Sequence, residues 1–134
     1  MKEIIEVYSG LMRKHAILEK IIKDLDKVES KVYAVSTKCS KKNKEEWNEL
    51  ISNLSDTVYK AKDIVSTDKD KEIYIKTYNQ LKKFWEDYKL GKVKAIEEFR
   101  LFVLEILSYL YKIVANEMES LALTAKELNE KIDN

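Results

Sequence analysis

Residues 101–115 read "LFVLEILSYLYKIVA", a stretch in which twelve of fifteen residues are apolar. The three interruptions, Glu105, Ser108 and Lys112, are spaced by three and four residues, which places them on one side of an α-helix. The apolar arc of this helix therefore covers well over half of its circumference, whereas a helix that packs against a core on one side needs little more than ~100°. In a chain of which 37% is charged, the surface that covers this helix decides the fold.

The composition of the whole chain favours a few long helices. Its 134 residues contain no proline and only two glycines, Gly10 and Gly91. Sheets need many turns, and turns draw on these two residues. The length is that of one domain with a core of its own.

Apolar residues recur at alternating steps of three and four in four segments, which predicts helices over about 2–36, 41–65, 67–90 and 93–131. Ser66 or Thr67 is a candidate N-cap for the third helix, and Gly91 suits the position just after its end. Short connections between amphipathic helices favour antiparallel neighbours. We therefore predict an all-α fold in a single domain, residues 1–134: an antiparallel up-down-up-down four-helix bundle with longer first and fourth helices.

The unequal helix lengths have a consequence at the end of the bundle where both termini lie. The first and fourth helices would span roughly 50–60 Å and the middle two roughly 35 Å. The extra length of the two long helices is expected to project as a two-helix stalk. Each helix has a seam, the row of apolar residues spaced by three and four, and half of the seam in the stalk is expected to be uncovered.

Two explanations account for the wide apolar arc of the fourth helix. It is either the central helix of its own bundle or part of a homodimer interface, since a large exposed apolar patch is unusual on a monomer and two-fold dimers are the commonest oligomers. The predicted interface for self-association or a protein partner comprises Phe102, Leu104, Tyr109, Tyr111 and Met118.

The residues needed for metal or cofactor chemistry are scarce. A di-iron bundle needs two Glu-x-x-His pairs, and this chain has one histidine, His15, and one cysteine, Cys39. Neither a glycine-rich phosphate loop nor a Gly-x-Ser-x-Gly motif is present. We therefore expect a protein that is not an enzyme and has no catalytic residue, metal or cofactor.

His15 lies on the apolar seam of the first helix, level with Glu117 in an antiparallel bundle. The two could form a buried polar pair in which the carboxylate raises the pKa of the imidazole. The alternative is a partly buried histidine with no such partner.

Lysines gather in the first and third connections and the helix ends beside them, which share one end of the predicted bundle. Residues 30–44 and 88–96 contain no acidic residue, although the whole chain has a net charge of only +1. This lysine-rich pole is either a solvated cap or a sequence-nonspecific nucleic-acid contact; it consists of Lys31, Lys38, Lys41, Lys42, Lys44, Lys89, Lys92 and Lys94. The same pole contains Cys39, either an ordinary loop thiol or one made reactive by the lysines.

A set of aromatic residues is compatible either with core packing or with a ligand pocket between helices: Trp47, Tyr74, Tyr78, Phe84 and Trp85.

Taken together, the sequence predicts a non-enzymatic interaction protein that forms a homodimer. The alternatives are a nucleic-acid-binding protein and a small-molecule-binding bundle. A single cysteine and the charged residues Glu3 and Glu6 near the N-terminus favour the cytoplasm, and no segment is long and apolar enough to span a membrane. The abundance of Lys and Glu fits either a hyperthermophile or an AT-rich genome.

Overall fold

The computed structural model describes residues 2–36, 43–92 and 96–133, and these residues form four α-helices. Helix α1 spans Lys2–Ser36, α2 spans Asn43–Ala61, α3 spans Asp68–Lys89 and α4 spans Ile96–Asp133. A short 3-10 helix, η1, continues α2 over Lys62–Ile64. The predicted all-α class and the four helices are confirmed, with no strand in the described part of the chain.

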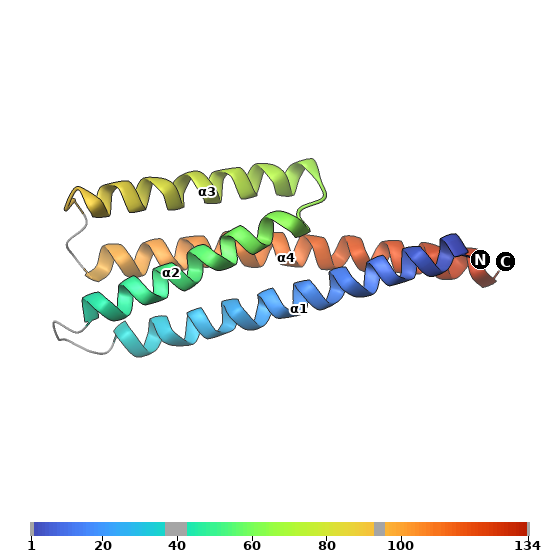
Figure 1. The fold of residues 1–134 in the computed structure, drawn as a ribbon, viewed down its shortest axis with the longest axis horizontal. Helices are drawn as coiled ribbons and strands as arrows, with labels where there is room; N and C mark the ends of the chain where they lie inside the picture. Colours follow the sequence, from blue (N-terminus) through green and yellow to red (C-terminus); the bar gives the residue numbers. More distant parts are fainter. Residues whose placement is uncertain (1, 37–42, 93–95, 134) are drawn as a thin grey trace.

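The chain reverses direction between successive helices, and the two long helices α1 and α4 run side by side along the length of the molecule (Figure 1). Helix α4 contacts each of the other three helices, α1 and α3 much more extensively than α2. The wide apolar arc of α4 is thus explained by its central place within its own chain. No helix among the described residues is long and apolar enough to cross a membrane.

Local chemistry at both ends of α3 fixes where this helix begins and ends. Thr67 is the N-cap, and its hydroxyl accepts a hydrogen bond of 3.1 Å from the backbone N–H of Asp70. At the other end Gly91 has a φ of 72°, and its N–H and that of Lys92 donate to the carbonyls of Tyr88 and Asp87. This pair of bonds is the Schellman pattern, which requires a left-handed residue and therefore favours glycine. Both sequence predictions for α3 are confirmed.

The core is continuous through all four helices. Aromatic rings join α2, α3 and α4 where the C-terminal end of α3 lies beside the N-terminal end of α4. Phe84 of α3 stacks on Phe102 of α4, with ring centroids 4.0 Å apart and an interplanar angle of 7°. Phe99 lies between the rings of Phe84 and Trp47, so that it links α4 to both α3 and α2. Offset and edge-to-face contacts of this kind add to the stability gained from burying the rings.

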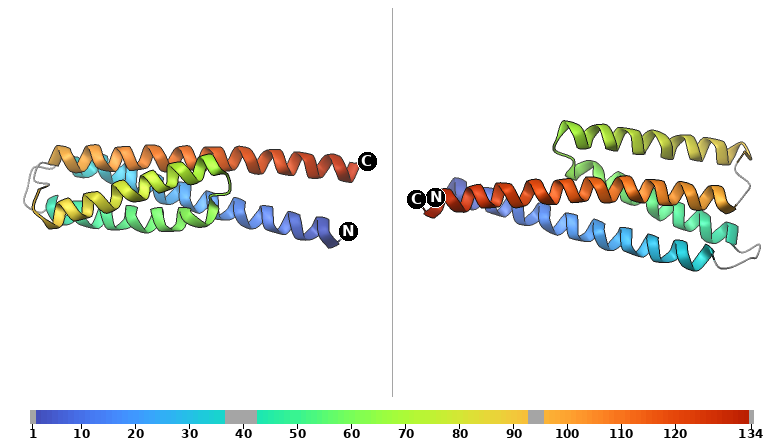
Figure 2. Two further views of the ribbon diagram at one scale, coloured as in Figure 1. Left: turned by 90° about the horizontal axis from the view of Figure 1, so that it is seen from above. Right: turned by 180° about the vertical axis from the view of Figure 1, so that it is seen from behind.

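Helices α1 and α4 continue well beyond the ends of α2 and α3, and both termini lie at the far end of this two-helix segment (Figures 1 and 2). We call residues 2–13 and 118–133 the extension. Within it, the side chains that face the partner helix are mostly half-buried, and the Tyr8 hydroxyl donates a hydrogen bond to Asn129 Oδ1 across the pair. The extension is therefore a packed pair of helices rather than two separate arms.

Candidate functional site

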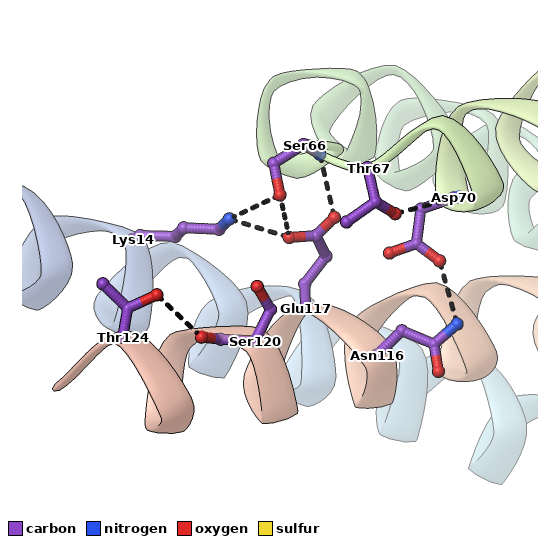
Figure 3. Close-up of polar contacts among 8 residues, drawn as sticks. All are labelled: Lys14, Ser66, Thr67, Asp70, Asn116, Glu117, Ser120 and Thr124. Atoms are coloured by element: carbon purple, nitrogen blue, oxygen red, sulfur yellow. Dashed lines mark hydrogen bonds and ion pairs between the residues drawn. The ribbon is translucent and has the colours of Figure 1, made fainter. Parts of the chain in front are cut away.

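The most connected polar site of the molecule lies at the base of the extension, where the α2–α3 connection meets α1 and α4 (Figure 3). At its centre is the carboxylate of Glu117, which is fully buried. Lys14 Nζ lies 2.7 Å from Glu117 Oε2, and the Ser66 hydroxyl donates to the same oxygen at 2.7 Å. The backbone N–H of Ser66 donates to Oε1 at 2.8 Å. We call Lys14, Ser66 and Glu117 the Glu117 cluster.

A second buried carboxylate lies next to this cluster. Asp70, in the first turn of α3, accepts a hydrogen bond of 2.9 Å from the Asn116 side chain on α4. Its carboxyl group points toward Glu117 (Figure 3). Through these contacts α1, α3, α4 and the α2–α3 connection all meet within one small volume.

The donors of the cluster keep Glu117 ionised although it is buried. Burial by itself would raise the pKa of this carboxyl, but the hydrogen bonds from Lys14 and from the backbone and hydroxyl of Ser66 outweigh it. The net effect is a pKa lowered from 4.5 to about 2. Both carboxylate oxygens of Glu117 accept hydrogen bonds from donors of the same chain, which is typical of a buried ion pair with a structural role.

The predicted His15–Glu117 pair is wrong, although Glu117 is buried as expected. His15 is exposed, and its Nε2 lies 3.6 Å from Glu19 Oε1, one turn further along the same helix. Lys14, and not His15, is the residue of α1 that pairs with Glu117. The buried stripe of α1 inside the bundle, Leu18, Ile21, Leu25 and Val28, leads to Lys14 when its steps of three and four are continued backward.

The residues predicted for self-association on α4 are half-buried and contact their own chain. Phe102 stacks on Phe84, and the Tyr111 hydroxyl donates to Asp26 at 2.7 Å and Glu29 at 2.9 Å. The Tyr109 hydroxyl donates to Glu105 at 3.0 Å. Leu104 and Met118 pack against the core from its edge.

Part of the lysine-rich pole is described. Lys31, Lys89 and Lys92 are exposed, and α1 and α3 end at the same end of the molecule (Figure 1). Lys44 lies in the first turn of α2. The remaining predicted residues of this pole, Lys38, Lys41, Lys42 and Lys94, together with Cys39, lie outside the described residues.

The predicted aromatic set divides into two groups. Trp47 and Phe84 are core residues, and Tyr74 is half-buried against the core. Tyr78 and Trp85, with Tyr59 of α2, line a groove between α2 and α3 that has a volume of about 380 Å³. The sequence signal for Tyr59 was its position one residue after the buried Val58, on the edge of the apolar stripe of α2.

No family model, curated protein or solved structure matches this chain. Among the described residues, no group of three or more His, Cys, Asp or Glu side chains could hold a metal ion. In the part of the chain that the structure describes, the fold and the sites define an all-α protein of four helices with a buried ion pair at Glu117 and an aromatic groove between α2 and α3.

Proposed function

We propose that this chain is an interaction protein that self-associates through the extension of its antiparallel four-helix bundle. A single comparison along α1 carries the proposal. Within the bundle, the seam residues Leu18 and Leu25 are 0% exposed, whereas Ile4 and Leu11, on the same seam in the extension, are only half-buried. In the bundle the seam of α1 lies among four helices, whereas in the extension it lies between α1 and α4 alone (Figures 1 and 2).

A second copy supplies the missing two helices. Two extensions packed against each other with two-fold symmetry make a four-helix arrangement of the kind that each chain already forms elsewhere. The side chains best placed for this contact are Ile5 and Met12, which are 63% and 70% exposed. They are seven residues apart and therefore share one face of α1.

The proposed interface lies on α1 in the extension and differs from the face of α4 predicted from the sequence. All five predicted side chains of α4 already contact their own chain, so Ile5 and Met12 offer more free apolar surface. Burial of one large apolar side chain stabilises an association by about 1.5–3 kcal/mol. Part of this gain offsets the entropy lost on association, so we expect Ile5 and Met12 in both copies to support a weak dimer.

The test is the mass in solution, measured by size exclusion with light scattering over a wide concentration range. We expect a species of twice 15.8 kDa that dissociates on dilution. The double variant Ile5→Glu/Met12→Glu is expected to weaken dimerisation at least about a hundredfold. The matched control is Ile75→Glu, which changes an exposed side chain of α3, within the bundle.

A monomer at every concentration would overturn the proposal. So would a dimer that the double variant leaves intact, or one that the Ile75 control disrupts equally. High salt is expected to preserve the dimer, because its contacts are apolar.

A further inference from the structure

The groove between α2 and α3 is walled by aromatic side chains that remain accessible. Tyr59 of α2 is 56% exposed and Tyr78 of α3 is 36% exposed, and their rings meet edge to face with centroids 6.1 Å apart. Trp85, two turns after Tyr78 on α3, is half-buried in the same groove, and Leu81 is a buried part of its lining. The helix rises by eleven residue steps from Tyr78 to Lys89, which gives this wall a length of roughly 16 Å.

The indole of Trp85 is held in position from the opposite helix. Its Nε1–H donates a hydrogen bond of 3.1 Å to the hydroxyl of Ser55, which is buried on α2 and itself donates to the carbonyl of Ile51. Because this donor is already occupied, the indole offers the groove its ring surface. A ring fixed in advance loses little conformational entropy when a ligand packs on it.

Positive charge lines the same wall. Lys82 and Lys89 are exposed, line the groove and have no ion-pair partner among the described residues. Glu86, between them along α3, is the one carboxylate among the lining residues. The wall thus combines aromatic surface with an excess of ammonium groups.

From this combination we propose that the α2–α3 groove is a binding site for a planar aromatic molecule that carries an anionic group. The ring system packs among Tyr59, Tyr78 and Trp85, and the anionic group lies near the ammonium groups of Lys82 or Lys89. A volume of about 380 Å³ is within the range of small-molecule sites. This site lies in the bundle and is independent of self-association through the extension.

The chain contains a built-in reporter for the test, because it has only two tryptophans. Trp85 lines the groove and Trp47 is buried in the core, so a nitrogen–proton correlation NMR spectrum is expected to show two indole signals. Titration with naphthalene sulfonate is expected to shift the Trp85 signal progressively and to leave the Trp47 signal in place. The uncharged isostere, naphthalene sulfonamide, is expected to bind more weakly.

Variants separate the contribution of the rings from that of the charges. Tyr78→Ala is expected to weaken naphthalene sulfonate binding roughly tenfold through lost ring contact. Its matched control is Ile75→Ala, which removes an exposed apolar side chain one turn away on α3. Lys82→Ser/Lys89→Ser is expected to abolish the preference for the sulfonate over the sulfonamide.

Three results would overturn the proposal. The first is no shift of the Trp85 signal at saturating sulfonate, and the second is a shift of both indole signals together, which indicates nonspecific binding or loosening of the core. The third is equal weakening by Tyr78→Ala and Ile75→Ala.

Discussion

Lys14 and Glu117 are separated by 103 residues in sequence, yet Lys14 Nζ lies 2.7 Å from the fully buried Glu117 carboxylate. The lysine is itself half-buried, and its ammonium group also reaches the Ser66 hydroxyl at 3.3 Å. Removal of one partner from a buried pair leaves the other charge without compensation, and this costs more than the pair gained. The two residues are therefore expected to act as one unit in the stability of the fold.

Glu117→Gln is expected to lower the free energy of unfolding by about 2–3 kcal/mol, because the amide loses the charge and presents N–H groups where donors converge. Lys14→Met is expected to cost less, since Ser66 still donates two hydrogen bonds to the carboxylate. The measurement is urea unfolding of both single variants and of the double variant, which gives the coupling energy. His15→Ala is the neighbouring control and is expected to change stability by no more than about 0.5 kcal/mol; a control as damaging as Glu117→Gln would contradict the assignment.

The stability of the protein is expected to fall in acid because of Glu117. Its pKa is about 2 in the folded protein, against a usual value of 4.5, so the unfolded chain binds a proton more readily than the folded one. The stabilising contribution is present above pH 4.5 and is lost as the pH falls toward 2. Unfolding curves measured across this window are expected to show a shallower pH dependence for Glu117→Gln than for the unaltered chain; parallel curves would argue against the ionised, buried carboxylate.

The two glycines are expected to respond in opposite directions to the same substitution. Gly91→Ala places a Cβ at a φ of 72°, and it is expected to destabilise the protein by about 1 kcal/mol. Gly10→Ala lies within α1, where an added Cβ meets nothing within 4 Å, and it is expected to stabilise by about 1 kcal/mol through helix propensity. Thermal unfolding of both variants checks this pair, and a shift of the same sign in both would contradict it.

Tyr111 bridges α4 to α1 through its hydroxyl, which donates to Asp26 and Glu29. Burial, together with these two carboxylates, raises the pKa of the phenol, so it stays protonated and remains a donor at all ordinary pH values. Tyr111→Phe is expected to cost about 1 kcal/mol. Tyr109→Phe, whose bond to Glu105 stays within α4, is the control and is expected to cost clearly less in the same unfolding measurement.

The sequence predicts the helices and the ends of α3 well, because these depend on local chemistry. Steps of three and four define each apolar stripe, Thr67 satisfies an N–H at the start of α3, and Gly91 has the one positive φ in the described chain. None of these features needs information from distant segments. The width of the apolar arc of α4, by contrast, fits either a central helix or a dimer interface, and it is the packing of the chain that places α4 beside all three other helices.

The Glu117 cluster could not be assigned from the sequence for a geometric reason. In the extension α1 lies beside α4 alone, whereas inside the bundle it also packs against α2. The buried stripe of α1 inside the bundle leads back to Lys14 rather than to His15. Ser66 was predicted as an alternative N-cap of α3, whereas Thr67 takes that role and leaves Ser66 to bind Glu117. The α2–α3 groove depends likewise on the separation of two helices, which no periodicity encodes.

The Glu117 cluster also has a consequence for the order of events in folding. Residues 14, 66 and 117 meet only after two long loops, 14–66 and 66–117, have closed, and the complete set of contacts forms only when both are in place. Helix pairing through the apolar seams needs fewer such closures, so the cluster is expected to form after the folding transition state. The cluster is then expected to slow unfolding and to leave the folding rate almost unchanged. It would lengthen the lifetime of the native state without changing how fast that state forms.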